Sequence, residues 1–303
     1  MRLHRRNVLL ALLVAVLVGA DLALAPEAPG SAGQVQPLLP GLRAEDVRRV
    51  VVSAADGEQA TLERRRARWR VVELGGYPAH EEAVQDLIAR LGGVRVDDPV
   101  ARESSSHPRF GVAAEGRRLQ LFDAQGGSLA DLVVGRPASE SRGGYVRRSG
   151  AGVVFRAPLL APPGSAPEAW LDSRLFTVAG SELESVRIER AGEAALEFTR
   201  TPGSEWSGPG GPRAGGNVVR LLRLCANLHL ADVDEGEGAG ERAWLRVELR
   251  PLTGRPEWVE FLGLDQHGAE RARLERADEG FRVTVPTGSV RRLEGLLEAL
   301  RSD

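Results

Sequence analysis

The chain has 303 residues, of which 42% are hydrophobic and 27% are charged, and its formal net charge is −2 at pH 7. This composition is that of a folded protein long enough for two domains, and it excludes a disordered chain. The small net charge predicts no general attraction to nucleic acid. All 40 basic residues are arginine, which excludes a lysine Schiff base and the lysine of a phosphate-binding loop.

The N-terminal stretch has the pattern of an export signal or a membrane anchor. Three arginines within the first six residues precede an apolar run over residues 8–20 that can be extended to residue 25. A spanning helix needs about 20 apolar residues, so we expect residues 1–25 to be an uncleaved transmembrane anchor. The arginines would then stay in the cytoplasm and the rest of the chain would lie outside. The alternative is secretion after cleavage near Ala20. The Pro- and Gly-rich residues 26–41 predict a linker.

The next part of the chain, residues 42–176, predicts a first unit built of short strands and one main helix. The Asp56–Gly57 pair between two apolar runs is a strong hairpin signal, and glycines after residue 91 are typical of a helix end. The expected elements are strands at 47–53, 58–65 and 68–73, a helix over 80–90, and strands at 117–123, 128–134, 144–148 and 152–156.

Residues 177–303 repeat this order of runs and turns. The apolar helix positions 84, 87, 88 and 91 map onto 218, 221, 222 and 225 without a gap. A final run of leucines at helical spacing predicts one more helix near the C-terminus. The sequence therefore predicts an α+β fold of two tandem repeats after the N-terminal anchor. Each repeat is expected to be a mostly antiparallel sheet with one main amphipathic helix.

Several short motifs of the first unit together resemble the bacterial domain-of-unknown-function family 4340. The motifs are a Tyr-Pro turn, a His-x-x-Phe-Gly segment, a strand ending in Val-Gly, a Tyr-Val-Arg strand and a Trp-Leu-Asp segment. They lie at Tyr77-Pro78, His107 to Gly111, Val134-Gly135, Tyr145 to Arg147 and Trp170 to Asp172. The resemblance extends from Leu42 to the C-terminus. It implies a membrane-anchored extracytoplasmic protein associated with ABC-type transport or gliding-type auxiliary components, and it implies no catalytic residue.

Two groups of residues invite a chemical interpretation, and neither is complete. Cys225 and His229 are four residues apart and two aspartates follow them, but a zinc site needs three or four ligands in closed geometry. Three serines precede His107, but a nucleophile needs a base within reach and a group that orients this base. We therefore expect no metal, no cofactor and no catalytic residue.

The predicted function is that of a membrane-tethered extracytoplasmic binding module, non-catalytic and accessory to a transport or cell-envelope assembly. Its expected partner is a membrane protein complex that includes ABC-type transporter components. The groove between the repeats, near residues 170–176, is the expected contact surface, because ligand sites favour domain interfaces. Two alternatives are a cell-envelope hydrolase and an envelope glycan-binding protein. The candidate surface residues are Trp69, Tyr77, His107, Tyr145, Trp170 and Asp172.

Overall fold

The computed structural model describes most of the chain beyond the N-terminal stretch. The described residues are 35–138, 143–158, 162–201, 205–209, 211–213, 216–234, 241–265, 267–276 and 279–302. The expected anchor over residues 1–25, the cleavage position at Ala20 and most of the expected linker lie outside these ranges. Among the described residues, no helix is long and apolar enough to cross a membrane.

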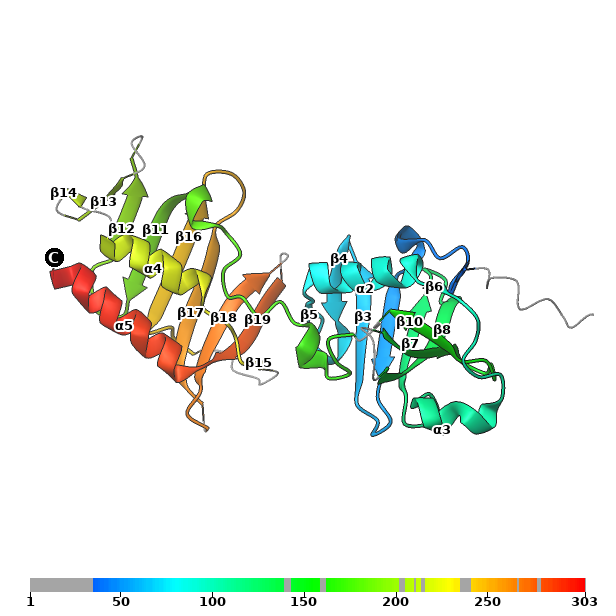
Figure 1. The fold of residues 1–303 in the computed structure, drawn as a ribbon. Helices are drawn as coiled ribbons and strands as arrows, with labels where there is room; N and C mark the ends of the chain where they lie inside the picture. Colours follow the sequence, from blue (N-terminus) through cyan, green and yellow to red (C-terminus); the bar gives the residue numbers. More distant parts are fainter. Residues whose placement is uncertain are drawn as a thin grey trace, which may run out of the picture.

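The fold is α+β, with two large antiparallel sheets that lie side by side (Figure 1). Within the described ranges, the first sheet has eight strands. In sheet order they are β10 (Phe155–Pro158), β9 (Gly143–Arg148), β8 (Ser128–Pro137), β7 (Arg117–Phe122), β2 (Arg49–Ser53), β3 (Gln59–Arg65), β4 (Arg68–Val71) and β5 (Tyr77–Pro78). Beside it, β1 (Gln36–Pro37) and β6 (Arg95–Val96) form a two-stranded sheet.

The second sheet has nine strands in the described part of the chain. In sheet order they are β14 (Gly211–Arg213), β13 (Trp206–Gly208), β12 (Leu196–Arg200), β11 (Leu183–Arg190), β16 (Leu245–Pro251), β17 (Glu257–Leu264), β18 (Glu270–Arg276), β19 (Glu279–Val285) and β15 (Asp232–Val233). The order matches that of the first sheet over eight strands. In both, the first strand lies in the interior, the next three extend to one side, and the last four extend to the other.

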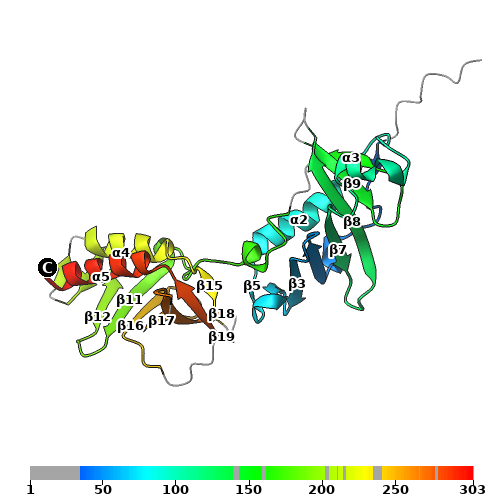
Figure 2. The same cartoon turned by 90° about the horizontal axis from the view of Figure 1, so that it is seen from below.

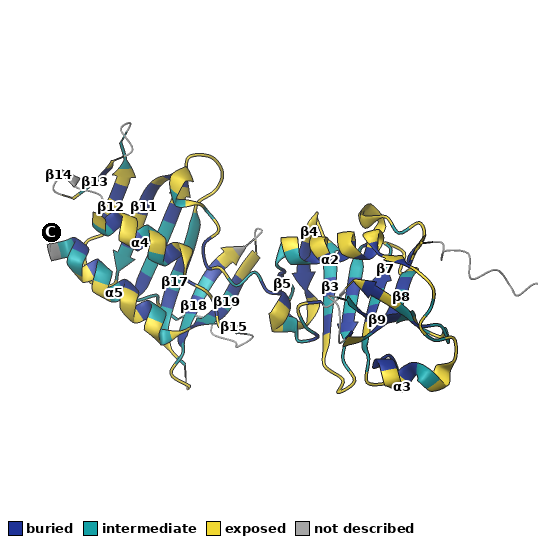
Figure 3. Ribbon diagram, in the orientation of Figure 1, coloured by how far each residue is buried: buried dark blue, intermediate teal, exposed yellow. Residues whose placement is uncertain are grey.

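The strands form because apolar and polar side chains alternate along them, so that one face of each sheet is buried (Figure 3). In β2, Val50 and Val52 are fully buried, whereas the residues between and beside them are half-buried. The hairpin from β2 to β3 turns as predicted: Asp56 accepts a hydrogen bond from the Glu58 backbone N–H at 3.0 Å, and Gly57 has φ 94°.

Helix α2 (Glu81–Gly93) covers the buried face of the first sheet. His80 is its N-cap, and the Nδ1 atom of this residue accepts a hydrogen bond from the Ala83 backbone N–H at 3.2 Å. The apolar positions predicted for this helix are those that are buried: Val84, Leu87, Ile88 and Leu91.

Helices α4 (Gly216–Ala226) and α5 (Thr287–Ser302) lie next to each other on one face of the second sheet (Figure 2). Three of the predicted apolar positions of α4 are buried, namely Val218, Leu221 and Cys225. Leu222, also expected in the core, is only half-buried and packs against the core from its edge. Its counterpart Ile88 is buried, so the two helices do not meet their sheets in the same way.

A short helix, α3 (His107–Phe110), covers part of the opposite face of the first sheet. Phe110 and two valines beyond α3 pack against Val133, whose side chain points away from the face covered by α2. Gly135 permits this contact: a Cβ atom there would lie 2.3 Å from the carbonyl oxygen of Phe110. The His-x-x-Phe-Gly and Val-Gly motifs are therefore two halves of one packing contact.

Candidate functional site

The segment that joins the two sheets is attached to both of them. Leu171 forms a β-bridge with Ala79 beside the first sheet. Further along, the Leu175 backbone N–H donates to the carbonyl of Leu228 at 2.9 Å, and Leu230 donates to the carbonyl of Ser173 at 2.8 Å. The connection is therefore a strap hydrogen-bonded at both ends rather than a free linker.

Side chains also connect the sheets directly. Arg70, on β4, is 5% exposed, and its Nη1 atom lies 2.7 Å from a carboxylate oxygen of Glu279 on β19. The rings of Tyr77 and Phe281 meet edge to face with centroids 4.9 Å apart. A buried guanidinium and an aromatic pair fix the orientation of the two sheets more firmly than exposed ion pairs would.

An open cleft of about 640 Å³ lies at this junction, beside the strap. This volume falls within the range of small-ligand sites. Its residues come from β4 and β5 of the first sheet, from the strap, and from β16, β17, β18 and the β16–β17 loop of the second. They are Arg68, Pro78, Asp172, Thr177, Arg246, Glu248, Arg255, Pro256, Glu257, Trp258 and Glu275.

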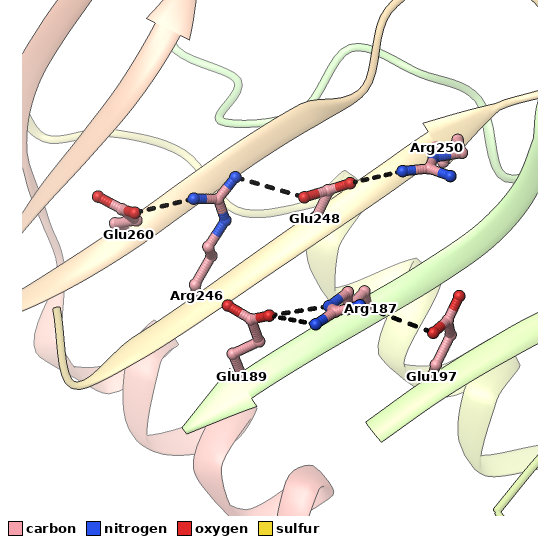
Figure 4. A network of polar contacts seen from close by, with 7 residues as sticks. All are labelled: Arg187, Glu189, Glu197, Arg246, Glu248, Arg250 and Glu260. Carbon is pink, nitrogen blue, oxygen red and sulfur yellow. Dashed lines mark hydrogen bonds and ion pairs between the residues drawn. The ribbon is translucent and has the colours of Figure 1, made fainter. Parts of the chain in front are cut away.

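The face of the second sheet opposite α4 and α5 carries a network of arginine and glutamate side chains (Figure 4). Arg187 lies 2.7 Å from Glu189 and 3.9 Å from Glu197, on the neighbouring strand. Arg246 lies 3.3 Å from Glu248 and 3.1 Å from Glu260. Each of these guanidiniums therefore stands between two carboxylates, and we call this surface the arginine–glutamate network.

Trp258 interrupts the network at the edge of the cleft. It pairs with Glu248 on β16, and the pairing of Val259 with Leu274 places it beside Glu275 on β18. The indole thus stands between two glutamates, where the network elsewhere has an arginine. The Arg246 guanidinium lies 5.0 Å from the centroid of its ring, within cation–π distance.

Four of the six predicted surface residues are buried, and three of these four are aromatic side chains. Trp69, Tyr77 and Trp170 are at most 2% exposed. Trp170 donates its indole N–H to the carbonyl of Gly164 at 2.9 Å. These rings contribute to the core and offer no open face on which a sugar or a partner could stack.

The other three predicted residues lie in two places. His107 is buried and its Nε2 atom lies 2.9 Å from the Gly152 carbonyl, while the half-buried Tyr145 packs on Phe110 with ring centroids 4.7 Å apart. Both belong to the α3 contact in the first sheet. Asp172 alone lines the junction cleft, where it pairs with Arg174 at 3.0 Å. This carboxylate raises the pKa of Arg174 by hydrogen bonding.

The two residues considered first for a metal site, Cys225 and His229, have separate structural roles. Cys225 is fully buried on α4, and burial raises the pKa of its thiol to about 12. His229 follows the helix and bonds to the strap, with its Nδ1 atom 3.0 Å from the Ser173 hydroxyl. In the described part of the chain, no three His, Cys, Asp or Glu side chains converge as a metal site would require.

Of the cleft residues, the sequence analysis selected only Asp172 as a candidate, and it did not select Trp258, Glu275 or Arg68. A signal for Trp258 is present in the sequence, because strict alternation places it on the opposite face from Val259 and Phe261, which are core residues. No local signal brings Arg68 to the same site, because it lies on the other sheet and almost 200 residues earlier.

Comparison with known proteins identifies the family. The family model described as "Domain of unknown function (DUF4340)" matches residues 69–237, more than half of the chain. The match begins in β4 and ends just beyond β15, so it spans the strap and parts of both sheets. No curated protein and no solved structure matches the chain. The chain belongs to the DUF4340 family of domains of unknown function.

Proposed function

We propose that this protein is a non-catalytic binding module that engages its partner at the junction cleft. The observation that carries the proposal is the attachment of both cleft walls to each other. Arg70 and Glu279 join β4 to β19, and Glu257 accepts a hydrogen bond from the Thr177 backbone N–H of the strap at 2.7 Å. Walls held in this way lose little conformational freedom when a partner binds, which favours affinity.

The proposed setting is the outer side of a bacterial inner membrane. The three early arginines and the apolar run over residues 8–20 support an anchor with its N-terminus inside. The partner is a membrane protein complex, with ABC-type transporter components as the candidates that the family resemblance implies. In this arrangement the module is an accessory subunit, tethered close to the assembly it serves, which raises its effective concentration there.

We further propose that the two sheets arose by tandem duplication. Their common strand order over eight strands supports this, as does the ungapped match of three of the four buried positions of α2 with buried positions of α4. Superposing β2–β5 and α2 on β11–β14 and α4 tests the proposal. A duplicated unit predicts that Val84 and Val218 coincide, and a shift of one helical turn between them would contradict it.

Location and partner can be tested with the full chain. Alkaline phosphatase fused after Asp303 is expected to be active, because it would fold outside the cytoplasm. An inactive phosphatase together with an active cytoplasmic reporter at the same position would overturn the proposed topology.

For the partner, a tagged full chain is cross-linked in cells and the adducts are identified. Photo-cross-linkers at Arg255 and Thr177, both in the cleft, are expected to capture a membrane protein. The same cross-linker at Gln125, an exposed turn of the first sheet outside this cleft, is the matched control. Equal adducts from all three positions would contradict the cleft as the contact surface.

A hydrolase is the second candidate, and one contact favours it. The Ser173 hydroxyl and the His229 imidazole are 3.0 Å apart, the distance at which a histidine can activate a serine. The full chain is therefore assayed against peptidoglycan, ester and peptide substrates. Turnover that Ser173→Ala abolishes would establish the hydrolase and overturn the binding proposal. Wild-type inactivity on all of them supports a structural role for this pair in holding the strap.

A further inference from the structure

Two charged side chains face the junction cleft without an ion-pair or hydrogen-bond partner in the described part of the chain. They are Arg68 on β4, in the first sheet, and Glu275 on β18, in the second. Both side chains are exposed. The cleft therefore has an uncompensated positive charge on one wall and an uncompensated negative charge on the other.

Most other charges around the cleft are already engaged. Glu248 receives hydrogen bonds from Arg246 and Arg250, each at 3.3 Å. Asp172 is paired with Arg174, and Glu257 is hydrogen-bonded to the strap. The charges of Glu248 and Asp172 are therefore compensated by arginines, and the carboxylate of Glu257 is occupied by hydrogen bonds from the strap. The distinctive feature of the site is the opposed pair of Arg68 and Glu275.

The half-buried Trp258 also lines the cleft, and by strand register it is the cross-strand neighbour of Glu275. In the arginine–glutamate network, Arg187 and Arg246 each occupy the position between two carboxylates. Trp258 occupies the corresponding position between Glu248 and Glu275, so Glu275 lacks the cation that other glutamates of the network have. An ammonium group placed against the indole and Glu275 would complete the row through cation–π and ionic contacts.

We propose that the junction cleft binds a small zwitterionic ligand, an amino acid or a short peptide with both termini charged. The ligand carboxylate pairs with Arg68, whose planar guanidinium suits bidentate contact with a carboxylate. The ligand ammonium lies beside Trp258 and pairs with Glu275. The inference goes beyond the proposed function, because it assigns a small ligand of stated chemistry to the cleft, and the chain without its membrane partner is expected to bind this ligand.

The test measures the binding of simple peptides to the full chain in detergent by calorimetry. The probes are alanine, dialanine and trialanine, which vary the spacing of the two charges, and the N-acetylated and C-amidated forms of each. At least one free form is expected to bind, and blocking either terminus should weaken it about tenfold, the loss of one charged hydrogen bond.

Two variants test which end of the peptide each wall of the cleft binds. With Glu275→Gln, the free and N-acetylated forms should bind alike, while the C-amidated form remains weaker. With Arg68→Gln, the free and C-amidated forms should bind alike, while the N-acetylated form remains weaker. Both replaced side chains are exposed, so these changes leave the core intact.

The controls are charges of the same two sheets outside the cleft. Glu189→Gln removes a network carboxylate paired with Arg187, and Arg65→Gln removes a guanidinium paired with Glu63. Both should keep the wild-type preference for the free peptide. The inference is overturned if no free form binds the wild type, if blocked forms bind as well as free ones, or if the controls lose the preference together with the cleft variants.

Discussion

The two sheets have the same order over eight strands, but they differ on the face that lies opposite their main helices. In the first, α3 and the segment after it bury Val133 on the face opposite α2. In the second, no helix among the described residues covers the face opposite α4 and α5 (Figure 2). Paired arginines and glutamates line this face instead (Figure 4). One topology can therefore be completed by apolar packing or by charge pairing. Where the charged face meets the first sheet, it forms a cleft.

The largest expected effect is a loss of stability from changes in the equivalent helices of the two sheets, α2 and α4. Leu87 and Leu221 are each 0% exposed in α2 and α4. Replacing either by alanine leaves a cavity and should lower the free energy of unfolding by about 2–5 kcal/mol. Chemical denaturation measures the loss. The exposed neighbour Val219 is the control, and Val219→Ala should change stability by less than about 0.5 kcal/mol. A similar cost at 219 and 221 would contradict the assigned helix face.

The α3 contact distinguishes the first sheet, so Gly135→Ala should affect it specifically. The added methyl would lie 2.3 Å from the Phe110 carbonyl oxygen and 2.7 Å from Val112. The resulting overpacking should cost about 1–3 kcal/mol in thermal or chemical unfolding. Gly295→Ala, on α5, is the matched control with nothing within 4 Å, and it should stabilise the protein by about 0.5–1 kcal/mol. Equal effects at the two glycines would show that the α3 contact is not tightly packed.

The junction can be tested with Arg70→Met, which keeps an unbranched apolar side chain and removes the guanidinium. The variant loses the bonds to Glu279 and to the Gly76 carbonyl, at 2.7 and 2.9 Å. Because the Glu279 side chain is 51% exposed and stays hydrated, we expect a cost of only about 1–2 kcal/mol.

The more informative measurement for Arg70→Met is the distance between the sheets. Spin labels at exposed positions 125 and 220 report it by pulsed electron resonance, and the distribution should broaden in the variant. Arg65→Gln breaks an ordinary exposed pair with Glu63 and should leave the distribution unchanged. An unchanged distribution in Arg70→Met would mean that the strap alone fixes the two sheets.

The smallest effect is the pH dependence of one exposed pair in the first sheet. The hydrogen bond from Arg118 holds the pKa of Asp131 below its usual 3.8. A carboxyl with a lowered folded-state pKa contributes stability above its unfolded pKa, and this contribution is lost as the pH falls through the folded one. The free energy of unfolding of the wild type at pH 7 should therefore exceed that of Asp131→Asn by less than about 1 kcal/mol. The difference should shrink from pH 4 towards pH 2, and a constant difference would assign the effect to packing.

Local patterns were enough to place most of the secondary structure. The hairpin at Asp56–Gly57 and the buried positions of α2 were predicted, because they depend on residues adjacent in the chain. The helix was expected to end at residue 90, before the two glycines, but it includes both of them and ends at Gly93. For the motif residues predicted to form a contact surface, local patterns were not enough. Trp69, Tyr77 and Trp170 are large aromatic side chains that a motif alone cannot assign to core or surface, and all three are buried.

The sequence by itself determined the α+β class and the order of the main strands and helices, because alternation, helical periodicity and turn residues are local properties. The family was indicated separately, by the resemblance of several short motifs. Tertiary structure decided the cleft. Arg68 and Glu275 are far apart in the chain and carry no local mark, and they face one cavity only because β4 meets the second sheet there. It also decided the burial of two positions that match in sequence: Ile88 is buried and Leu222 is half-buried, because burial depends on how each helix packs on its own sheet.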